Sequence, residues 1–279
     1  MTMKSFQFEM GPDRVIRGNV HEGEGQAGQK HPVLIFCHGF KGFKDWGSFP
    51  YACEQLAKRG MTVIRFNFSH NGVAETDFDE LEKFAVNTYA KEIEDLQALV
   101  AELNAGRLPL PEMADPKQLF LLGHSKGGGD SILFGANHPQ VKGIITWNGI
   151  AHVSLFDDKL RAEIAEHGVG YIPNARTKQQ MPIRKEVIDD VDQNPEAYDL
   201  LAKVREMVQP LLIVQGEEDF GRLVHGAKRL HEADADSRLH WIKGADHVWN
   251  TRHPFADTSD ALEEAIAVSA NFILEISKP

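Results

Sequence analysis

The sequence contains little cysteine and no long apolar run. Its two cysteines, Cys37 and Cys53, are too few for a disulfide framework. Cys37 lies within an apolar stretch, so we expect both to be reduced thiols in the core of a cytoplasmic protein. No N-terminal segment has the pattern of a signal peptide, and no uninterrupted apolar run could span a bilayer. The sequence therefore does not predict a membrane partner.

Positive charge is also scarce. The 279 residues include 30 lysines and arginines against 41 aspartates and glutamates, which gives a formal net charge of -11 at pH 7. This balance argues against a nucleic acid or an anionic membrane surface as the main partner. Repeats and low-complexity tracts are absent as well. We expect a globular protein that binds a small molecule, and the composition leaves its oligomeric state open.

Sequence patterns that would hold a metal ion or a nucleotide are missing. The thirteen histidines show no H-E-x-x-H or comparable ligand spacing. Neither a G-x-G-x-x-G nor a G-x-x-x-x-G-K-[ST] element is present. We therefore expect a protein with no metal site and no cofactor.

The most informative segment is LFLLGHSKGGGD, which runs from Leu119 to Asp130. Its apolar start predicts a buried strand and the residues after it suit a helix, so that a G-x-S-x-G pattern joins a strand to a helix. In this context the pattern predicts a nucleophile elbow with Ser125 at its tip. The turn has room only for glycine at Gly123 and Gly127, and we expect a strained backbone at Ser125.

Strand and helix patterns alternate along most of the chain. Strands are expected at 6–10, 14–20, 32–37, 61–68, 119–122, 142–147, 210–215 and 238–242. Helices are expected at 48–59, 86–103, 222–232 and 259–276, with another directly after the elbow. Such alternation predicts an α/β fold with a mostly parallel central sheet and helices on both faces.

Residues 150–208 interrupt this alternation. They are rich in charge, contain three prolines and offer only short, ambiguous elements. We interpret them as an inserted cap or lid over the carboxyl edge of the sheet, where ligands bind in such folds. The expected organisation is a core formed by 1–149 and 209–279, with a cap over 150–208.

A serine nucleophile needs a base, and the base needs an orienting acid. The predicted strand 210–215 leads into Asp219, and the predicted strand 238–242 leads into His247. Because the carboxyl ends of parallel strands meet at one edge of a sheet, both side chains should reach Ser125. The order serine, acid, histidine is that of α/β-hydrolases.

Other carboxylates compete for the role of the acid. Glu217, Glu218 and Asp246 lie beside the same strand ends. We favour Asp219 because a short turn after Gly216 would bring it back over the end of its strand.

The oxyanion of a tetrahedral intermediate needs two preorganised N–H donors. The backbone N–H of Lys126, directly after the nucleophile, is one candidate. The second is the backbone N–H of Phe40, in the loop after the predicted strand 32–37.

Six segments carry a further signal: HGFKGFKDWG (38–47), IRFNFSHNG (64–72), GHSKGG (123–128), NARTKQQMP (174–182), QGEED (215–219) and GADH (244–247). Through them the chain resembles the α/β-hydrolase superfamily over essentially its whole length. Within it, the chain is most similar to bacterial feruloyl/cinnamoyl esterases and dienelactone-hydrolase-like proteins. The resemblance implies a Ser–Asp–His triad, an oxyanion hole from Phe40 and Lys126, and a cap that shapes the pocket. The chain departs from its relatives at 69–72, at Lys126 and at 220–222, and it has serine where dienelactone hydrolases proper have cysteine.

The expected loops at the strand ends supply candidate pocket residues. Five aromatic residues are expected to wall an apolar acyl pocket, namely Phe43, Trp46, Trp147, Phe220 and Trp249. Arg176, in the predicted cap, is a candidate for closing over the substrate. Lys41, Lys44 and Lys126 surround the oxyanion loops in sequence; they are either solvated or attract a substrate with a remote negative charge.

Taken together, the sequence predicts a serine carboxylic-ester hydrolase that acts on a small-molecule ester through an acyl-enzyme. Two alternatives stay open. A serine peptidase or amidase of the same fold would form the same kind of acyl-enzyme. A non-catalytic ligand-binding protein on a hydrolase scaffold would have no need of the strained serine.

Overall fold

The structure is a computed structural model that describes residues 2–25 and 30–278. Within these ranges, eight strands form one sheet in the spatial order β1-β2-β4-β3-β5-β6-β9-β10. Their bounds are β1 Met3–Gly11, β2 Arg14–His21, β3 His31–Cys37, β4 Thr62–Asn67, β5 Ala114–His124, β6 Val141–Trp147, β9 Leu211–Gly216 and β10 Arg238–Ile242. The hairpin β1–β2 is antiparallel and β2 pairs antiparallel with β4, whereas every pair from β4 to β10 is parallel. The expected mostly parallel sheet is confirmed.

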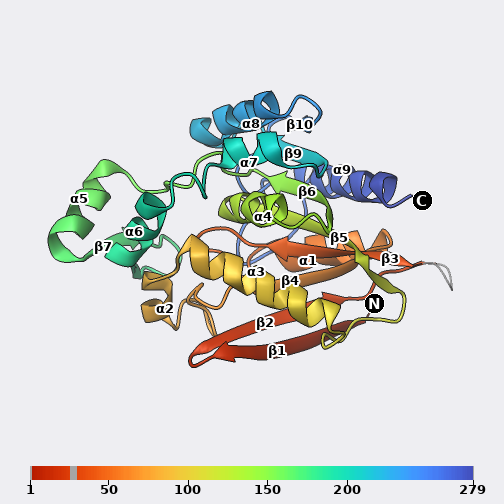
Figure 1. Cartoon of the computed structure of the whole chain (residues 1–279), viewed down its shortest axis with the longest axis horizontal. Coiled ribbons are helices and arrows are strands. Elements are labelled where there is room, and N and C mark those ends of the chain that lie inside the picture. The colour runs from red at the N-terminus through yellow and green to blue at the C-terminus, as the bar shows by residue number, and fades with distance from the viewer. Residues whose placement is uncertain (1, 26–29, 279) are drawn as a thin grey trace.

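Helices cover both faces of this sheet (Figure 1). On one face lie α1 (Phe49–Lys58) and α9 (Asp260–Ile276). On the other lie α3 (Tyr89–Asn104), α4 (Lys126–Ala136) and α8 (Gly221–Ala233). Each of these helices had been expected, and only the exact ends differ.

The central strand β3 shows why residues 32–37 are all apolar. Val33 and Ile35 point to the face covered by α3 and α4, whereas Leu34 and Phe36 point to the face covered by α1 and α9. All seven residues of β3 are buried. A strand covered on both faces needs apolar residues at every position, because successive side chains alternate between two layers of core.

The segment predicted as a cap contains three helices and two strands. They are α5 Asp158–His167, β7 Val169–Pro173, β8 Gln180–Arg184, α6 Lys185–Gln193 and α7 Leu200–Glu206. Strands β7 and β8 pair only with each other, and α5, β7 and α6 project beyond one end of the main sheet (Figure 1). In contrast, α7 packs against α4 and α8. The limits 150–208 stay a prediction.

The projecting elements share a small core with the loops that follow β3 and β4. Met181, Ile183 and Ile188 pack in one cluster with Phe43 and Phe78. The short helix α2 (Leu81–Ala85), which the sequence analysis did not predict, contacts β8 at the same place. These contacts hold the loop between β7 and β8 near the carboxyl edge of the main sheet.

Both cysteines are free and buried, as expected. Burial raises the pKa of the Cys37 thiol and of the Cys53 thiol to about 12. Since the thiolate is the reactive form, neither should react with Ellman's reagent at pH 8 in the native protein, and both should react after unfolding in urea. A thiol that reacts at once in the native protein would contradict the burial of these side chains.

None of the helices in the described residues combines the length and the apolar character that crossing a bilayer requires.

Candidate active site

The sharp turn between β5 and α4 presents Ser125. β5 ends at His124 and α4 begins at Lys126, so a single residue makes the turn. Ser125 has φ 56° and ψ −118°, a combination that residues other than glycine rarely adopt. A Cβ on Gly123 would lie 2.0 Å from the carbonyl oxygen of Gly127. The predicted strained elbow is therefore confirmed, and the glycine before the serine is required by close backbone contact.

His247 and Asp219 face each other across the loops that follow β10 and β9. The Nδ1 atom of His247 lies 3.0 Å from Oδ1 and 3.2 Å from Oδ2 of Asp219. The Asp219 carboxylate also accepts hydrogen bonds from Gln215 Nε2 at 3.0 Å and from the Phe220 N–H at 2.6 Å. Its side chain is completely buried, whereas that of His247 is 24% exposed. A fixed carboxylate thus holds one nitrogen of an accessible imidazole.

The competing carboxylates do not reach His247. Glu217 and Glu218 are exposed. Asp246 accepts hydrogen bonds from the N–H groups of Val248 and Asn250 and so closes its own turn. Of the four acids that the sequence offers, only Asp219 contacts the imidazole.

Ser125 and His247 line one cavity of about 460 Å³. Its walls come from the loop after β3, from the loop after β10, and from residues 174–176 between β7 and β8. No hydrogen bond between the Ser125 hydroxyl and His247 occurs among the described side chains. Hydrogen bonds between catalytic groups are often loose without substrate and tighten in the complex.

The turn Gly39–Phe40 packs directly against the elbow. A Cβ on Gly39 would lie 2.9 Å from Cβ of Ser125. His38 fixes the turn, since its Nε2 accepts a hydrogen bond from the Phe68 N–H at 3.3 Å. Gly39 and Phe40 line the cavity together with Ser125. The backbone at Phe40 is thus held beside the nucleophile, and its role in an oxyanion hole stays a prediction.

Two of the six predicted pocket residues line this cavity, Trp46 and Arg176. The prediction for Trp147 and Trp249 is wrong, because both are buried in the core with ring centroids 5.7 Å apart. Trp147 ends β6 on the face covered by α9, and its indole N–H donates to Ser269 of that helix at 2.8 Å. The position of Trp147 at the end of a strand therefore does not determine to which face of the sheet its side chain points.

The predictions for Phe43 and Phe220 also need correction. Phe43 lies beneath the cavity wall, buried against Phe78 with ring centroids 6.1 Å apart. Phe220 is 60% exposed, although its ring centroid lies 5.3 Å from that of His247. Neither residue lines the cavity, because one belongs to the core below it and the other to the surface beside it.

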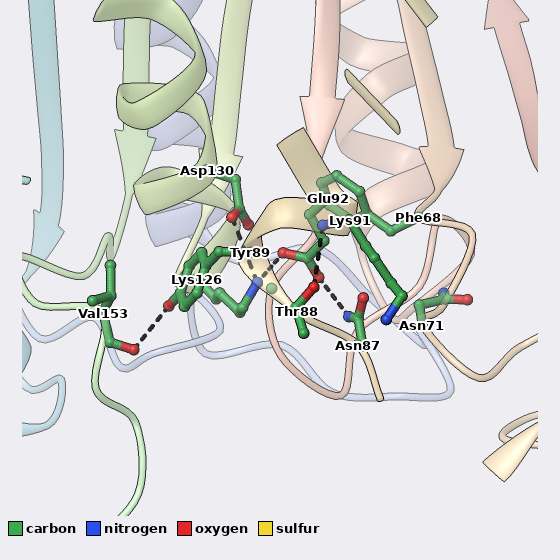
Figure 2. A network of polar contacts seen from close by, with 12 residues as sticks. Phe68, Asn71, Asn87, Thr88, Tyr89, Lys91, Glu92, Lys126, Asp130 and Val153 are labelled. Atoms are coloured by element: carbon green, nitrogen blue, oxygen red, sulfur yellow. Dashed lines mark hydrogen bonds and ion pairs between the residues drawn. The ribbon is translucent and has the colours of Figure 1, made fainter. Parts of the chain in front are cut away.

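The side chain of Lys126 extends into the interior between α3 and α4 (Figure 2). Its ammonium forms an ion pair with Glu92 and lies 3.5 Å from Asp130 Oδ1. It also lies over the ring of Tyr89, 3.9 Å from the centroid. Neither alternative that the sequence leaves open for Lys126 holds, because its ammonium is neither solvated nor among the groups that line the cavity of Ser125. A second lysine of that group, Lys44, pairs with Asp45.

Among the residues of the cavity wall that sequence reasoning missed are His124, Arg252 and His253. Burial lowers the pKa of His124 to about 3, and its ring lies 4.8 Å from that of His247 between centroids. His253 accepts a hydrogen bond from the Gly47 N–H at 2.7 Å, which ties the loop after β10 to the loop after β3. Their nearness in sequence to Ser125 and His247 was the only available signal.

A metal centre finds no support in the described part of the chain, where no group of three or more histidine, cysteine or acidic side chains is placed to hold an ion.

Residues 28–196 match the model of a protein family described as serine aminopeptidase, S33. This range includes Ser125 and Phe40 and ends before Asp219 and His247. No curated protein matches the chain by sequence.

Several solved structures share the arrangement of the whole chain. Est1E from Butyrivibrio proteoclasticus is 17% identical, with 98% of each chain covered and a TM-score of 0.67. The esterase domain of a Rhodothermus marinus protein is 18% identical, with 98% of this chain and 99% of that chain covered and a TM-score of 0.64. A putative hydrolase from Agrobacterium vitis S4 is 18% identical, with 99% of each chain covered and a TM-score of 0.72. At these identities the likeness concerns the fold.

Proposed function

Because the chain belongs to the serine aminopeptidase S33 family of serine hydrolases with the α/β-hydrolase fold, we propose that it hydrolyses carboxylic esters through an acyl-enzyme. The observation that carries the proposal is the grouping of Ser125, His247 and Asp219. A strained serine opens into a cavity that it shares with an imidazole, and a buried carboxylate 3.0 Å away orients that imidazole.

In the proposed reaction, Ser125 Oγ attacks the carbonyl carbon while His247 Nε2 takes its proton. Asp219 accepts the hydrogen bond from Nδ1–H, which keeps Nε2 free to act as the base and stabilises the imidazolium. The imidazolium then protonates the leaving alkoxide, and the alcohol departs from the acyl-enzyme. Water activated by the same imidazole attacks the acyl group, and the carboxylic acid is released.

The oxyanion of both tetrahedral intermediates would accept hydrogen bonds from the N–H groups of Lys126 and Phe40. Among the described residues, neither N–H donates to another protein group, which leaves both available. Lys126 is the first residue of α4 and directly follows the proposed nucleophile, so its amide would lie beside the oxyanion. The positive end of the helix dipole adds to this stabilisation.

The alternative of an aminopeptidase is disfavoured by the charge of the cavity. An enzyme that cleaves the first residue from a peptide must bind a free ammonium group, for which a carboxylate in the pocket is the usual partner. No aspartate or glutamate occurs among the described residues that line the cavity. An ester does not require that partner. Est1E has also been solved with ferulic acid bound, which supports a carboxylic acid product in a site of this fold.

Substrate preference tests this proposal. With p-nitrophenyl esters from acetate to octanoate, we expect saturable hydrolysis and an optimum acyl length set by the 460 Å³ cavity. For L-aminoacyl p-nitroanilides we expect kcat/KM to be at least roughly 100-fold lower than for the best ester, because the free ammonium group of these substrates finds no carboxylate partner in the cavity. Faster cleavage of an aminoacyl anilide than of any ester would establish the peptidase.

Labelling with a p-nitrophenyl phosphonate tests the second alternative. Such a phosphonate bonds only to a serine that is activated by a base, and p-nitrophenolate leaves. Stoichiometric modification at Ser125, located by peptide mass mapping, is the expected result. A protein that stays unlabelled and hydrolyses no ester would be a ligand-binding protein instead.

A further inference from the structure

Deepening the proposed ester-hydrolase function, on which it rests, we propose that the natural ester carries a carboxylate close to the scissile bond and that Lys41 binds it. Lys41 lies directly after the proposed oxyanion donor Phe40, and both residues line the cavity that holds Ser125.

The wall of the cavity has a charge opposite to that of the chain. The whole sequence has 41 acidic and 30 basic residues. The described residues that line the cavity nevertheless include three cations, Lys41, Arg176 and Arg252, and no carboxylate. Two further lining residues, His124 and His253, have pKa values lowered by burial and therefore stay neutral at pH 7. Positive charge is concentrated here against the trend of the composition.

These three cations differ in their protein partners. Arg176 forms an ion pair with Asp77, which also lies 3.6 Å from His253. Arg252 is exposed, so water solvates its charge. Lys41 is half-buried, and within the described ranges it has no carboxylate at ion-pair distance. Burial lowers the pKa of its ammonium, which means that the charge is partly desolvated without a counter-ion.

Among the described residues, the Lys41 ammonium has no hydrogen-bond partner either, and it lies 6.0 Å from the centroid of the Phe40 ring. A partly desolvated cation without a partner is costly in the free enzyme. An anionic group of the substrate would remove that cost on binding. Of the three cations, Lys41 therefore gains most from an anionic ligand.

The backbone at Lys41 supports the same assignment. Its φ is 56°, in the left-handed region, where a lysine is strained and a glycine would not be. The turn is closed by a hydrogen bond from the Gly42 N–H to the Gly39 carbonyl oxygen at 2.9 Å. Residues with a strained backbone occur preferentially at functional sites. The strain also fixes where the lysine stem starts, one residue from Phe40.

This geometry limits the distance between the carboxylate and the ester. Consecutive Cα atoms are about 3.8 Å apart, and a lysine side chain reaches roughly 6 Å beyond its own Cα. If the Phe40 N–H binds the oxyanion, the ammonium reaches groups two to four bonds from the scissile carbonyl. The half-ester of a short dicarboxylic acid, or the ester of a short hydroxy acid, fits this description.

Paired substrates distinguish the acyl side from the alcohol side. One pair is mono-p-nitrophenyl glutarate and p-nitrophenyl pentanoate, and the other is the butyrate ester of glycolic acid and the butyrate ester of glycolamide. We expect the anionic member of at least one pair to have a kcat/KM about tenfold higher at 20 mM salt, with the advantage decreasing at 500 mM salt. Ser125→Ala gives the background, including the spontaneous cyclisation of the glutarate.

Variants test the role of Lys41. In Lys41→Gln the ratio of anionic to neutral kcat/KM should fall about tenfold, mainly through KM, and Lys41→Arg should restore it. Lys44→Gln is the matched control, because Lys44 pairs with Asp45 and does not line the cavity, and it should leave the ratio unchanged.

Three results would overturn the inference. A wild-type ratio at or below one in both pairs contradicts the anionic substrate, and a ratio that survives Lys41→Gln contradicts the role of Lys41. In both cases, neutral esters cleaved by wild type but not by Ser125→Ala would still support the ester-hydrolase function. If neither member of either pair is cleaved, the proposed function and this inference fail together.

Discussion

Ester hydrolysis should fall by about 10⁵–10⁶-fold in kcat when Ser125 is replaced by alanine. The variant keeps the cavity and both proposed oxyanion donors, but it has no nucleophile for an acyl-enzyme. The remaining rate should exceed that in water, because binding and the backbone donors still stabilise the transition state. The measurement is kcat for the best p-nitrophenyl ester at matched protein concentrations, with the active fraction of the wild type determined by phosphonate titration.

Two controls separate chemistry from folding. Circular dichroism melting should give the same midpoint within a few degrees, since alanine removes only one hydroxyl from a turn set by backbone contacts. Ser237→Ala is the control substitution. The Ser237 hydroxyl forms a hydrogen bond with His231, and neither residue is among the described residues that line the cavity, so this variant should retain its activity. A Ser125→Ala enzyme with more than about a hundredth of the wild-type kcat would point to another nucleophile.

The second large effect concerns stability. Replacing Glu92 with glutamine should lower the free energy of unfolding by about 3 kcal/mol. The side chains of Lys126 and Glu92 are only 7% and 4% exposed, so the remaining ammonium would be buried with one partner fewer (Figure 2). Asp130 and the ring of Tyr89 stay close to it, which keeps the loss at the lower end for a broken buried pair. Urea unfolding followed by tryptophan fluorescence measures the change.

A double variant and an exposed pair test the cause. Lys126→Met with Glu92→Met should be more stable than Glu92→Gln, because no buried ammonium is left without its partner. Asp130 can take up a proton in that variant, since burial already raises its pKa to about 6. At the surface, Glu102→Gln removes the partner of Arg107 and should cost less than about 0.5 kcal/mol. If Glu92→Gln and Glu102→Gln lowered the free energy of unfolding equally, burial of the Lys126–Glu92 pair would not be the cause of the effect on stability.

The fold and the centre of the site could be predicted because local patterns specify them. A strand that is covered on both faces needs a continuous apolar run, such as residues 32–37 of β3, and the elbow admits only glycine at Gly123. The turn after β9 is short, so the choice of Asp219 followed from chain geometry, and the contact with His247 agrees with it. In each case the decisive forces act between residues close in sequence or at defined strand ends.

Side-chain direction was harder to predict. Trp147 is the last residue of β6 and Lys126 lies just after the end of β5, yet the side chain of Trp147 packs in the core beside α9 and that of Lys126 lies between α3 and α4. Which way such a residue points depends on partners far along the chain, such as Glu92 for Lys126. The wall formed by His253 depends on contacts across the chain in the same way, because its partner Gly47 is distant in sequence. Sequence patterns do not encode these contacts between residues that are far apart in the chain.

The order of strands in the sheet has a consequence for biosynthesis. β5, which presents the serine, lies inside the sheet, whereas β9 and β10 are synthesised after the other described strands of the sheet and complete it beyond β6. Until they dock, β6 is an open edge, and the serine has neither the base nor the acid that we assign to it. A nascent chain would thus contain the proposed nucleophile without its proposed base and acid, and we expect the proposed activity to begin only when β9 and β10 have paired with the sheet.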